Sequence, residues 1–329
     1  DAATVIQSAI NALDTGGVVT IKEGTYDIAT PLTGTKAETL ILRGMGMGST
    51  ILNWTGSERS VLNFDPGSFV TNQQIVLEDL QVTMTNCENV TAVNLNRVAL
   101  AHLQRIWVRT TNKGASSFGF YTSAPGNNSL VMIDCRSSNF DVNFKIYTDH
   151  VFMARCQAIY GSKGFWFATG GAEIVGANLT AYHQTNEETS VGFHIDYGSY
   201  PGQLTLISPY SENQAGGDYA PTDYEIRAGH ANTNVILICP DAARKPPVVT
   251  IIGDRNYQVI GRWFRNSSVA TFNGDGNTRS FKIAHGLVRV PRNYFALKAA
   301  ANLPEIDYLT ADATNIVVNF TSAPKKGTR

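Results

Sequence analysis

Apolar and polar residues alternate in short segments that recur seven times between Val76 and Pro240. The segments are VLEDLQVTM, HLQRIWVRT, MIDCRSSNF, MARCQAIYG, GANLTAYHQ, LISPYSENQ and LICPDAARK. Their alignment places one residue of each in a common column: Leu80, Ile106, Cys135, Cys156, Leu179, Pro209 and Pro240. By subtraction, consecutive members of this column lie 26, 29, 21, 23, 30 and 31 residues apart. A period of two, repeated at intervals of roughly 20–30 residues, predicts the stacked coils of a solenoid.

A second set of segments lies between the first: AVNLN, FGFYT, FKIYT, FWFAT, FHIDY and YEIRA. Its predicted inward pairs are Val93/Leu95, Phe118/Phe120, Phe144/Ile146, Phe165/Phe167, Phe193/Ile195 and Tyr224/Ile226. Two short strands in each repeat, with no helical periodicity, predict an all-β fold, a parallel β-helix whose inward columns form its core. A β-sandwich also has short alternating strands, but it would not keep two segments in the same order through six or seven turns.

The two ends of the chain differ from this repeat. Residues 4–13 place apolar side chains on one helical face, and Gly16-Gly17 then ends the predicted helix, which would cap the solenoid. Beyond Pro240, the stretch Asn273-Gly274-Asp275-Gly276 predicts a hairpin between alternating strands. We therefore expect a cap and first coils at 1–60, a parallel β-helix at 61–262 and a small β-sandwich at 263–329.

Two stretches resemble known families. IQSAINAL, GGVVTIKEGTYDI and LILRGMGMGSTIL are similar to the start of the pectate-lyase-like β-helix superfamily, which includes viral tailspikes and microbial surface proteins. This resemblance covers residues 1 to about 262 and implies a right-handed coil. The stretch SSVATFNGDGNTRSFKIAHGLVRVPRNYFALKA resembles the C-terminal β-sandwich of phage and archaeal surface proteins, with its His-Gly-Leu…Pro signature. The resemblance implies that the sandwich lacks its last strand here, and we expect His285 to be a structural turn residue. The scaffold hosts lyases, hydrolases and inert spikes alike, so it does not decide the function.

Composition excludes several partners. Charged residues make up 16% of the chain and the net charge is −1, which gives no electrostatic basis for binding nucleic acid. No apolar run reaches the length of about 18 residues that a membrane-spanning helix needs. The four cysteines have neither a zinc-site spacing nor a CxxC motif, and we expect no metal or cofactor.

Asparagine sequons point to an exported protein. Acceptor sequons occur at Asn53, Asn89, Asn127, Asn178, Asn266 and Asn319, more than chance predicts, and we expect glycosylation at these positions. The protein would then be extracellular, on a cell surface or on a virion.

The outward positions of the second set of segments hold the candidate site. The predicted outward column is Asn94, Gly119, Lys145, Trp166, His194 and Glu225, and the next is Asn96, Tyr121, Tyr147, Ala168, Asp196 and Arg227. Tyr121, Tyr147 and Trp166 are suited to stacking on sugar rings. His194, Glu225 and Asp196 are candidate acid/base groups. Lys145 or Arg227 would neutralise a uronate.

A structural role explains the same side chains. Opposite charges lie on neighbouring coils in these columns, as they do for Asp79, Arg105, Asp134 and Arg155, which pairing along the solenoid would produce. The sequence shows no aspartate pair like that of pectin hydrolases and no acidic cluster suited to calcium.

We therefore expect a non-catalytic structural or assembly protein, such as a sheath, filament, cell-surface or virion spike component. It would self-associate into an oligomer or filament and contact extracellular or cell-surface polysaccharide. A polysaccharide lyase or glycoside hydrolase is the alternative. Cys135 and Cys156 should stack on adjacent coils, as free thiols rather than a disulfide.

Overall fold

The computed structural model describes residues 2–34, 39–65, 70–85, 88–122, 129–168, 173–183, 190–197, 202–213, 222–227, 233–242, 249–252, 257–260, 274–284, 303–312 and 314–326. The chain divides into two compact units, residues 1–259 and 260–329. Strands dominate both units, and the described part of the chain contains one helix, α1 (Ala2–Asn11).

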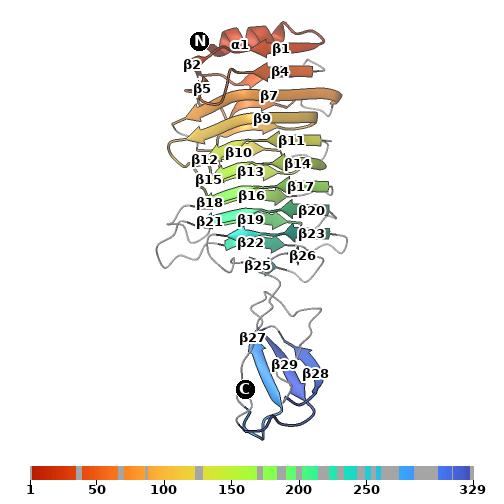
Figure 1. Ribbon diagram of the computed structural model, residues 1–329. Coiled ribbons are helices and arrows are strands. Elements are labelled where there is room, and N and C mark those ends of the chain that lie inside the picture. Colours follow the sequence, from red (N-terminus) through yellow and green to blue (C-terminus); the bar gives the residue numbers. More distant parts are fainter. Residues whose placement is uncertain are drawn as a thin grey trace. The chain divides into compact units, whose positions relative to one another are not determined.

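The first unit is a parallel β-helix, as the sequence predicted, with three strands in each full coil (Figure 1). We number its faces by the order of their strands in a coil. The first face contains β1 (Gly16–Thr20), β4 (Thr39–Arg43), the first halves of β7 (Val70–Met84) and β9 (Val98–Thr110), β11 (Ser129–Ile133), β14 (His150–Ala154), β17 (Glu173–Ala177), β20 (Gly202–Ile207), β23 (Thr233–Ile238) and β26 (Tyr257–Ile260).

The second face contains β2 (Gly24–Ile28), β5 (Thr50–Trp54), the second halves of β7 and β9, β12 (Arg136–Ser138), β15 (Gln157–Ile159), β18 (Thr180–His183), β21 (Tyr210–Asn213) and β24 (Asp241–Ala242). The third face contains β3 (Leu32–Thr33), β6 (Ser60–Phe64), β8 (Thr91–Leu95), β10 (Phe118–Tyr121), β13 (Val142–Ile146), β16 (Lys163–Ala168), β19 (Val191–Asp196), β22 (Thr222–Arg227) and β25 (Val249–Ile252).

The first set of repeat segments contains two strands in each coil instead of the predicted one. The chain bends between the first and second faces at one residue with positive φ in each of seven coils: Asp79, Arg105, Asp134, Arg155, Asn178, Ser208 and Cys239, with φ between 49° and 58°. The backbone ladder continues through the bend, because the amide of Arg155 donates to the carbonyl of Ala177 and that of Gln157 donates to the carbonyl of Cys135. Asn178, Asp79 and Asp134 are residue types that adopt this conformation more often than most, but Arg105, Arg155, Ser208 and Cys239 are not, so the sequence carries no consistent turn signal there.

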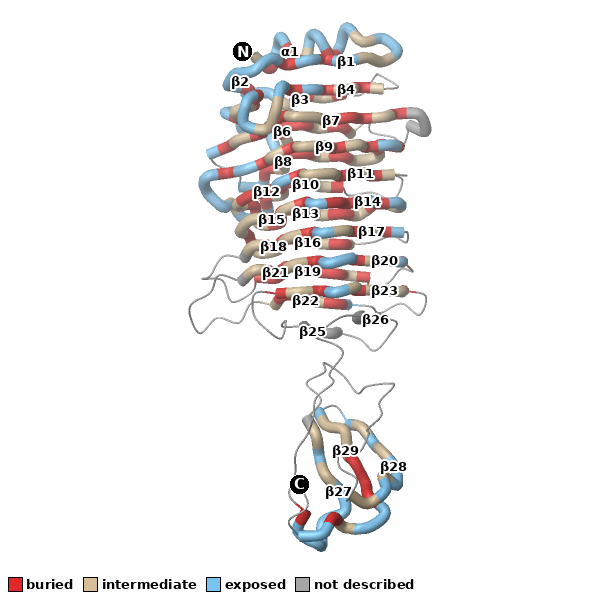
Figure 2. The backbone as a smooth tube through the Cα atoms, viewed as in Figure 1, coloured by how far each residue is buried: buried red, intermediate tan, exposed pale blue. Residues whose placement is uncertain are grey.

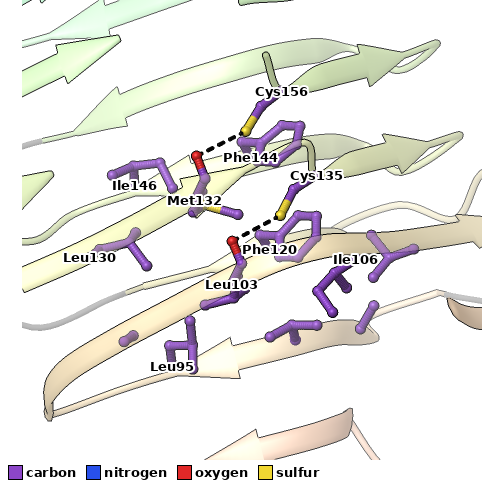
Figure 3. Packing of buried hydrophobic residues seen from close by; sticks show 14 of the residues in the cluster. Leu95, Leu103, Ile106, Phe120, Leu130, Met132, Cys135, Phe144, Ile146 and Cys156 are labelled. Carbon is purple, nitrogen blue, oxygen red and sulfur yellow. Dashed lines mark hydrogen bonds between the residues drawn. The ribbon is translucent and has the colours of Figure 1, made fainter. Parts of the chain in front are cut away.

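The residue after each bend points inward and forms the predicted column from Leu80 to Pro240. Strand pairing sets Leu80 beside Ile106 directly, and the pairs Trp107–Arg136 and Arg136–Gln157 extend the register through the two cysteines. Cys135 and Cys156 are fully buried and carry free thiols, as expected. Each thiol lies 3.6 Å from a carbonyl oxygen of the preceding coil, that of Leu103 for Cys135 and that of Met132 for Cys156 (Figure 3).

Large inward residues on the third face are matched by small inward residues on the second face. On the third face Phe120, Phe144, Phe165, Phe193 and Tyr224 stack with centroid distances of 4.7–5.2 Å and interplanar angles of 6–11°. On the second face the matching inward column from Ser137 onward is small: Ser137, Ala158, Ala181, Ser211 and Ala242. The stacked rings therefore occupy space that the small residues leave, and both columns are buried. Buried positions recur along the strands of successive coils (Figure 2).

The helix α1 covers the N-terminal end of the coil, in agreement with the predicted cap. Ala3, Ile6 and Ile10 are its buried residues and join the core. The Gln7 side chain also hydrogen-bonds both the amide and the carbonyl of Thr33 on β3, at 2.8 and 3.0 Å. An amide side chain thus takes the place of a neighbouring strand where the third face begins.

The second unit contains a three-stranded antiparallel sheet in the order β27 (Ser280–Ala284), β29 (Asn315–Phe320), β28 (Ile306–Ala311). Gly274–Gly276 of the predicted hairpin lie in a turn before β27, and Asp275 accepts hydrogen bonds from Asn277 and Thr278. Asn273 and His285 lie outside the described residues, and the second sheet of the predicted sandwich stays a prediction.

Candidate functional site

The outward surface of the third face contains most of the candidate residues predicted from the sequence. Strand pairing aligns one column along it: Asn63, Asn94, Tyr121, Lys145, Trp166, His194 and Glu225. Asp196 and Arg227 occupy the next outward column, as predicted. Tyr147 belongs to that second column too, since it follows Ile146, the partner of Phe167.

The predicted register was wrong for one strand, β10. Tyr121 pairs with Asn94 and Lys145, so it lies in the first column, where the sequence had predicted Gly119. Gly119 instead points inward, and a Cβ atom there would collide with Oγ of Ser137. In β10 two successive inward residues, Gly119 and Phe120, follow Phe118. Phe118 and Phe120 therefore do not point the same way, although they are two residues apart.

An aromatic and basic cluster occupies the middle of the face. The Lys145 ammonium lies 5.0 Å from the ring centroid of Tyr121, 4.5 Å from that of Trp166 and 5.4 Å from that of Phe118. Lys163 adds a second ammonium 4.3 Å from the Trp166 centroid. Each cation over a ring contributes about 0.5–2 kcal/mol, depending on how far it is desolvated.

The two lysines also affect one another. Burial lowers the pKa of Lys145, and the positive charge of Lys163 lowers it further. In the described part of the chain, Arg59, Lys145 and Lys163 form no ion pair with a carboxylate. An anionic group arriving at this surface would therefore meet cations whose charge no described side chain neutralises.

An open pocket of about 340 Å³ adjoins this cluster. Its lining combines two aromatic rings, one cation and short polar groups: Arg59, Ser60, Asn89, Thr91, Asn94, Ser116, Phe118 and Tyr121. The rings of Phe118 and Tyr121 lie 4.8 Å apart, and both also contact the Lys145 ammonium. The sequence did not predict this pocket, because Arg59, Asn89 and Ser116 lie outside the strands in turns of different coils.

The predicted acid/base residues meet on adjacent coils. Nδ1 of His194 lies 3.4 Å from Oε2 of Glu225, and Nε2 lies 3.9 Å from Oδ2 of Asp196. Glu225 also accepts a 2.8 Å hydrogen bond from Nε of Arg227, and Trp166 meets the imidazole edge-on at 5.4 Å. The His194 side chain is only 6% exposed, which leaves little of it for a substrate to reach.

Burial decides the protonation of this group. It lowers the pKa of His194 below the ordinary value of 6.5, and Lys163 acts in the same direction, while Glu225 and Asp196 oppose both. For Glu225, burial tends to raise the pKa, but the hydrogen bond from Arg227 and the proximity of His194 leave it below the ordinary value. At neutral pH the imidazole is therefore uncharged and beside an ionised, already paired carboxylate. An uncharged imidazole is the form that can accept a proton, but a side chain that is only 6% exposed offers little of it to a substrate.

Four of the six predicted glycosylation sites lie among the described residues. Asn53 donates to Asp27 and accepts from Thr83, and Asn319 is nearly buried and accepts from Ser280, so both amides are used within the fold. Asn89 and Asn178 are exposed on turns with positive φ. Asn127, Asn266 and the remaining cysteine, Cys87, lie outside the described residues.

The described residues hold no cluster of three or more histidine, cysteine, aspartate or glutamate side chains placed to bind a metal ion. Among the same residues, no helix has the length and apolar character needed to cross a membrane.

Comparisons with known proteins agree with the fold. No protein-family model and no curated protein matches the chain. A solved structure described as "Geobacillus virus E2 - ORF18" aligns with a TM-score of 0.50 and 13% identity, over 97% of this chain and 75% of that one. A pectin methylesterase in complex with hexasaccharide VII aligns with a TM-score of 0.44 and 14% identity, over 78% of this chain and 87% of that one. At such low identity the viral structure supports the fold alone, and the second match adds nothing to that conclusion.

Proposed function

We propose that this protein is a non-catalytic β-helix appendage of a virion or cell surface, and that it contacts acidic polysaccharide through its third face. The observation that carries the proposal is Lys145, which lies within cation–π distance of Phe118, Tyr121 and Trp166 beside an open polar pocket. Aromatic rings stack on the apolar faces of sugars, while unpaired cations favour carboxylated or sulfated units.

The argument against catalysis rests on His194, Glu225 and Asp196. The His194 side chain is only 6% exposed, and Glu225 is held by Arg227. In a lyase or hydrolase, an acid or base must come within hydrogen-bond distance of the scissile bond, directly or through one water. These side chains contact one another instead, as the ladder pairing predicted from the sequence requires.

A polysaccharide lyase or hydrolase is the alternative, and one observation favours it. A histidine between two carboxylates is also the arrangement that orients a catalytic base. A lyase would use it to remove the proton next to a uronate carboxyl group, with Lys145 or Lys163 neutralising that group.

Two measurements separate these functions. Binding of the full chain to uronate polysaccharide, measured by calorimetry, should weaken about tenfold or more in Trp166→Ala and in Lys145→Ala, because each removes a ring or a cation from the contact surface. The matched control is Tyr182→Ala, a half-buried aromatic residue on the second face, which should bind like the wild type. Neutral polysaccharide should bind less tightly than acidic polysaccharide.

The second measurement is product release. We expect no unsaturated or shortened sugars from the wild-type protein, and the His194→Ala, Glu225→Gln double variant should bind polysaccharide as the wild type does. Products released by the wild type but not by the double variant would establish a lyase and refute the proposal. Equal binding of all variants would show that the third face is not the contact surface.

A further inference from the structure

The outer surface of the first face is apolar between β11 and β23. Its central outward column is Val131, Phe152, Val175, Thr205 and Ile236. The adjacent outward column, next to the bend, is Ile133, Ala154, Ala177, Ile207 and Ile238. Phe152 is 44% exposed and Ile207 39%, so large apolar side chains lie open on this surface. Nine of these ten outward residues are therefore apolar.

The sequence of these strands has the pattern of a sheet that is covered on both sides. The segments LVMI, VFMA, EIVGA, LTLI and VILI are nearly continuous apolar runs. Strands of the third face, such as VNFKI and TDYEIR, place charged residues at outward positions instead. A parallel strand with one solvent-facing side does not need apolar residues on both sides, whereas a strand buried on both sides does.

Charge is confined to the edge of this surface. The described outward positions of β11, β14, β17, β20 and β23 hold no lysine or arginine. His150 and Glu173 lie in the edge column, with Ser129, Gln203 and Asn234 as its other members. An apolar centre with a polar rim, depleted of charge in the middle, is the composition of a protein–protein interface.

We infer that this surface binds a second copy of the chain, side by side along the solenoid. The apolar columns span the five strands from β11 to β23, and β1, β4, β7 and β9 extend the same face beyond them, with the Arg43–Glu78 ion pair among their side chains. At about 4.8 Å per strand and about 3.3 Å per residue, five residues wide, the five apolar strands present about 400 Å², and these nine strands together present about 700 Å². This is close to the roughly 800 Å² that each partner contributes to an interface of standard size.

Two further properties fit a second copy. The side chains repeat at the strand spacing, so the ridges of one solenoid match the grooves of another that lies along it. The net charge of −1 gives no long-range repulsion between copies. Since the polysaccharide contact was assigned to the third face, this inference does not depend on the proposed function.

The test is the mass of the full chain in solution by light scattering coupled to size exclusion. We expect an oligomer at low micromolar concentration. Phe152→Lys should raise the dissociation constant at least a hundredfold and give a monomer with an unchanged circular dichroism spectrum, because it places a charge in the apolar centre. The matched control is Ile159→Lys, which lies on the same coil but points outward on the second face and should leave the oligomer intact.

A wild-type monomer at about 100 µM would overturn the inference, as would an oligomer that persists in Phe152→Lys. If that variant does not fold, the oligomer mass of Val175→Ser, and that of the wild type at high salt, test the inference instead. An apolar interface should lose affinity in Val175→Ser and persist at 1 M salt. An oligomer that dissociates at high salt would instead be held by charge, and this surface would not be its interface.

Discussion

Replacement of Phe165 by alanine should nearly unfold the β-helix. Phe165 is fully buried and lies between Phe144 and Phe193, with ring centroids 4.7 and 5.1 Å away. Truncation of a buried phenylalanine costs about 3–5 kcal/mol. A loss of about 5 kcal/mol is expected here, because the variant loses both stacked ring pairs. Each pair contributes about 0.5–1.5 kcal/mol in addition to the burial of apolar surface.

The surroundings of Phe165 cannot close the cavity. Ala158 and Ala181 on the second face are too small to fill it, and the backbone is already tight: a Cβ atom on Gly164 would lie 2.6 Å from the carbonyl oxygen of Gly192. A loss near 5 kcal/mol is a large part of the 5–15 kcal/mol that stabilises a typical domain. In a solenoid the damage also reaches the neighbouring coils, since each coil is stabilised by those on either side.

Urea unfolding followed by circular dichroism measures the effect, and the fraction of soluble protein on expression reports it if the variant does not fold. Phe165→Leu is the matched control, because it keeps an apolar side chain at the same position and should lose only about 1–1.5 kcal/mol. A soluble Phe165→Ala protein that unfolds at the wild-type urea concentration would refute the packing described for the aromatic column.

Three further predictions concern single positions. Burial lowers the pKa of His194, so the unfolded chain binds a proton at this side chain more readily than the folded chain does. The free energy of unfolding should therefore fall as pH drops below about 6.5. His194→Gln should reduce that fall, as measured by urea titrations at pH 7.5 and 5.5. The hydrogen bond from Arg155 lowers the pKa of Asp134 below 3.8. The stability that this pair contributes is therefore present above that pH and lost as pH falls below it. In Asp134→Asn the free energy of unfolding should fall less steeply with pH in acid. Ser208 has a φ of 50°, which glycine adopts readily and a β-branched residue does not. Ser208→Gly should raise the free energy of unfolding by about 0.5–1 kcal/mol, and Ser208→Val should lower it by about 1–2 kcal/mol. Thermal unfolding measures both, and equal melting points for the two variants would contradict the bend.

The sequence predicted the stacking of coils because each coil repeats the same inward column. Alignment alone placed Cys135 next to Cys156 and Phe144 next to Phe165, and strand pairing has the same register. The free energy of burial forces a repeated position to face inward in every coil, so the repetition itself is informative. The capping helix followed from its apolar face for the same reason.

Three features were not predictable, or were predicted wrongly, for different physical reasons. The register of Phe118 failed because two successive inward residues follow it, which breaks the alternation on which the alignment relied. The pocket beside Tyr121 contains Arg59, Asn89 and Ser116 from turns of different coils, where no periodicity applies. The apolar outer surface of the first face did have a signal, since runs such as VILI do not alternate, but such a run does not by itself show which of its residues face outward.

The recurring bend between the first and second faces also makes the length of this protein adjustable. Residues 135–155 span one coil, the 21 residues from Cys135 to the residue before Cys156. Their removal would join Asp134 directly to Cys156, so that a bend residue is again followed by a member of the inward column. Trp107 would then pair with Gln157, and the rod would be shorter by about 4.8 Å. Whole coils can therefore be lost or duplicated in genes of this kind without a new core having to evolve, and the length of the β-helix can change in fixed steps.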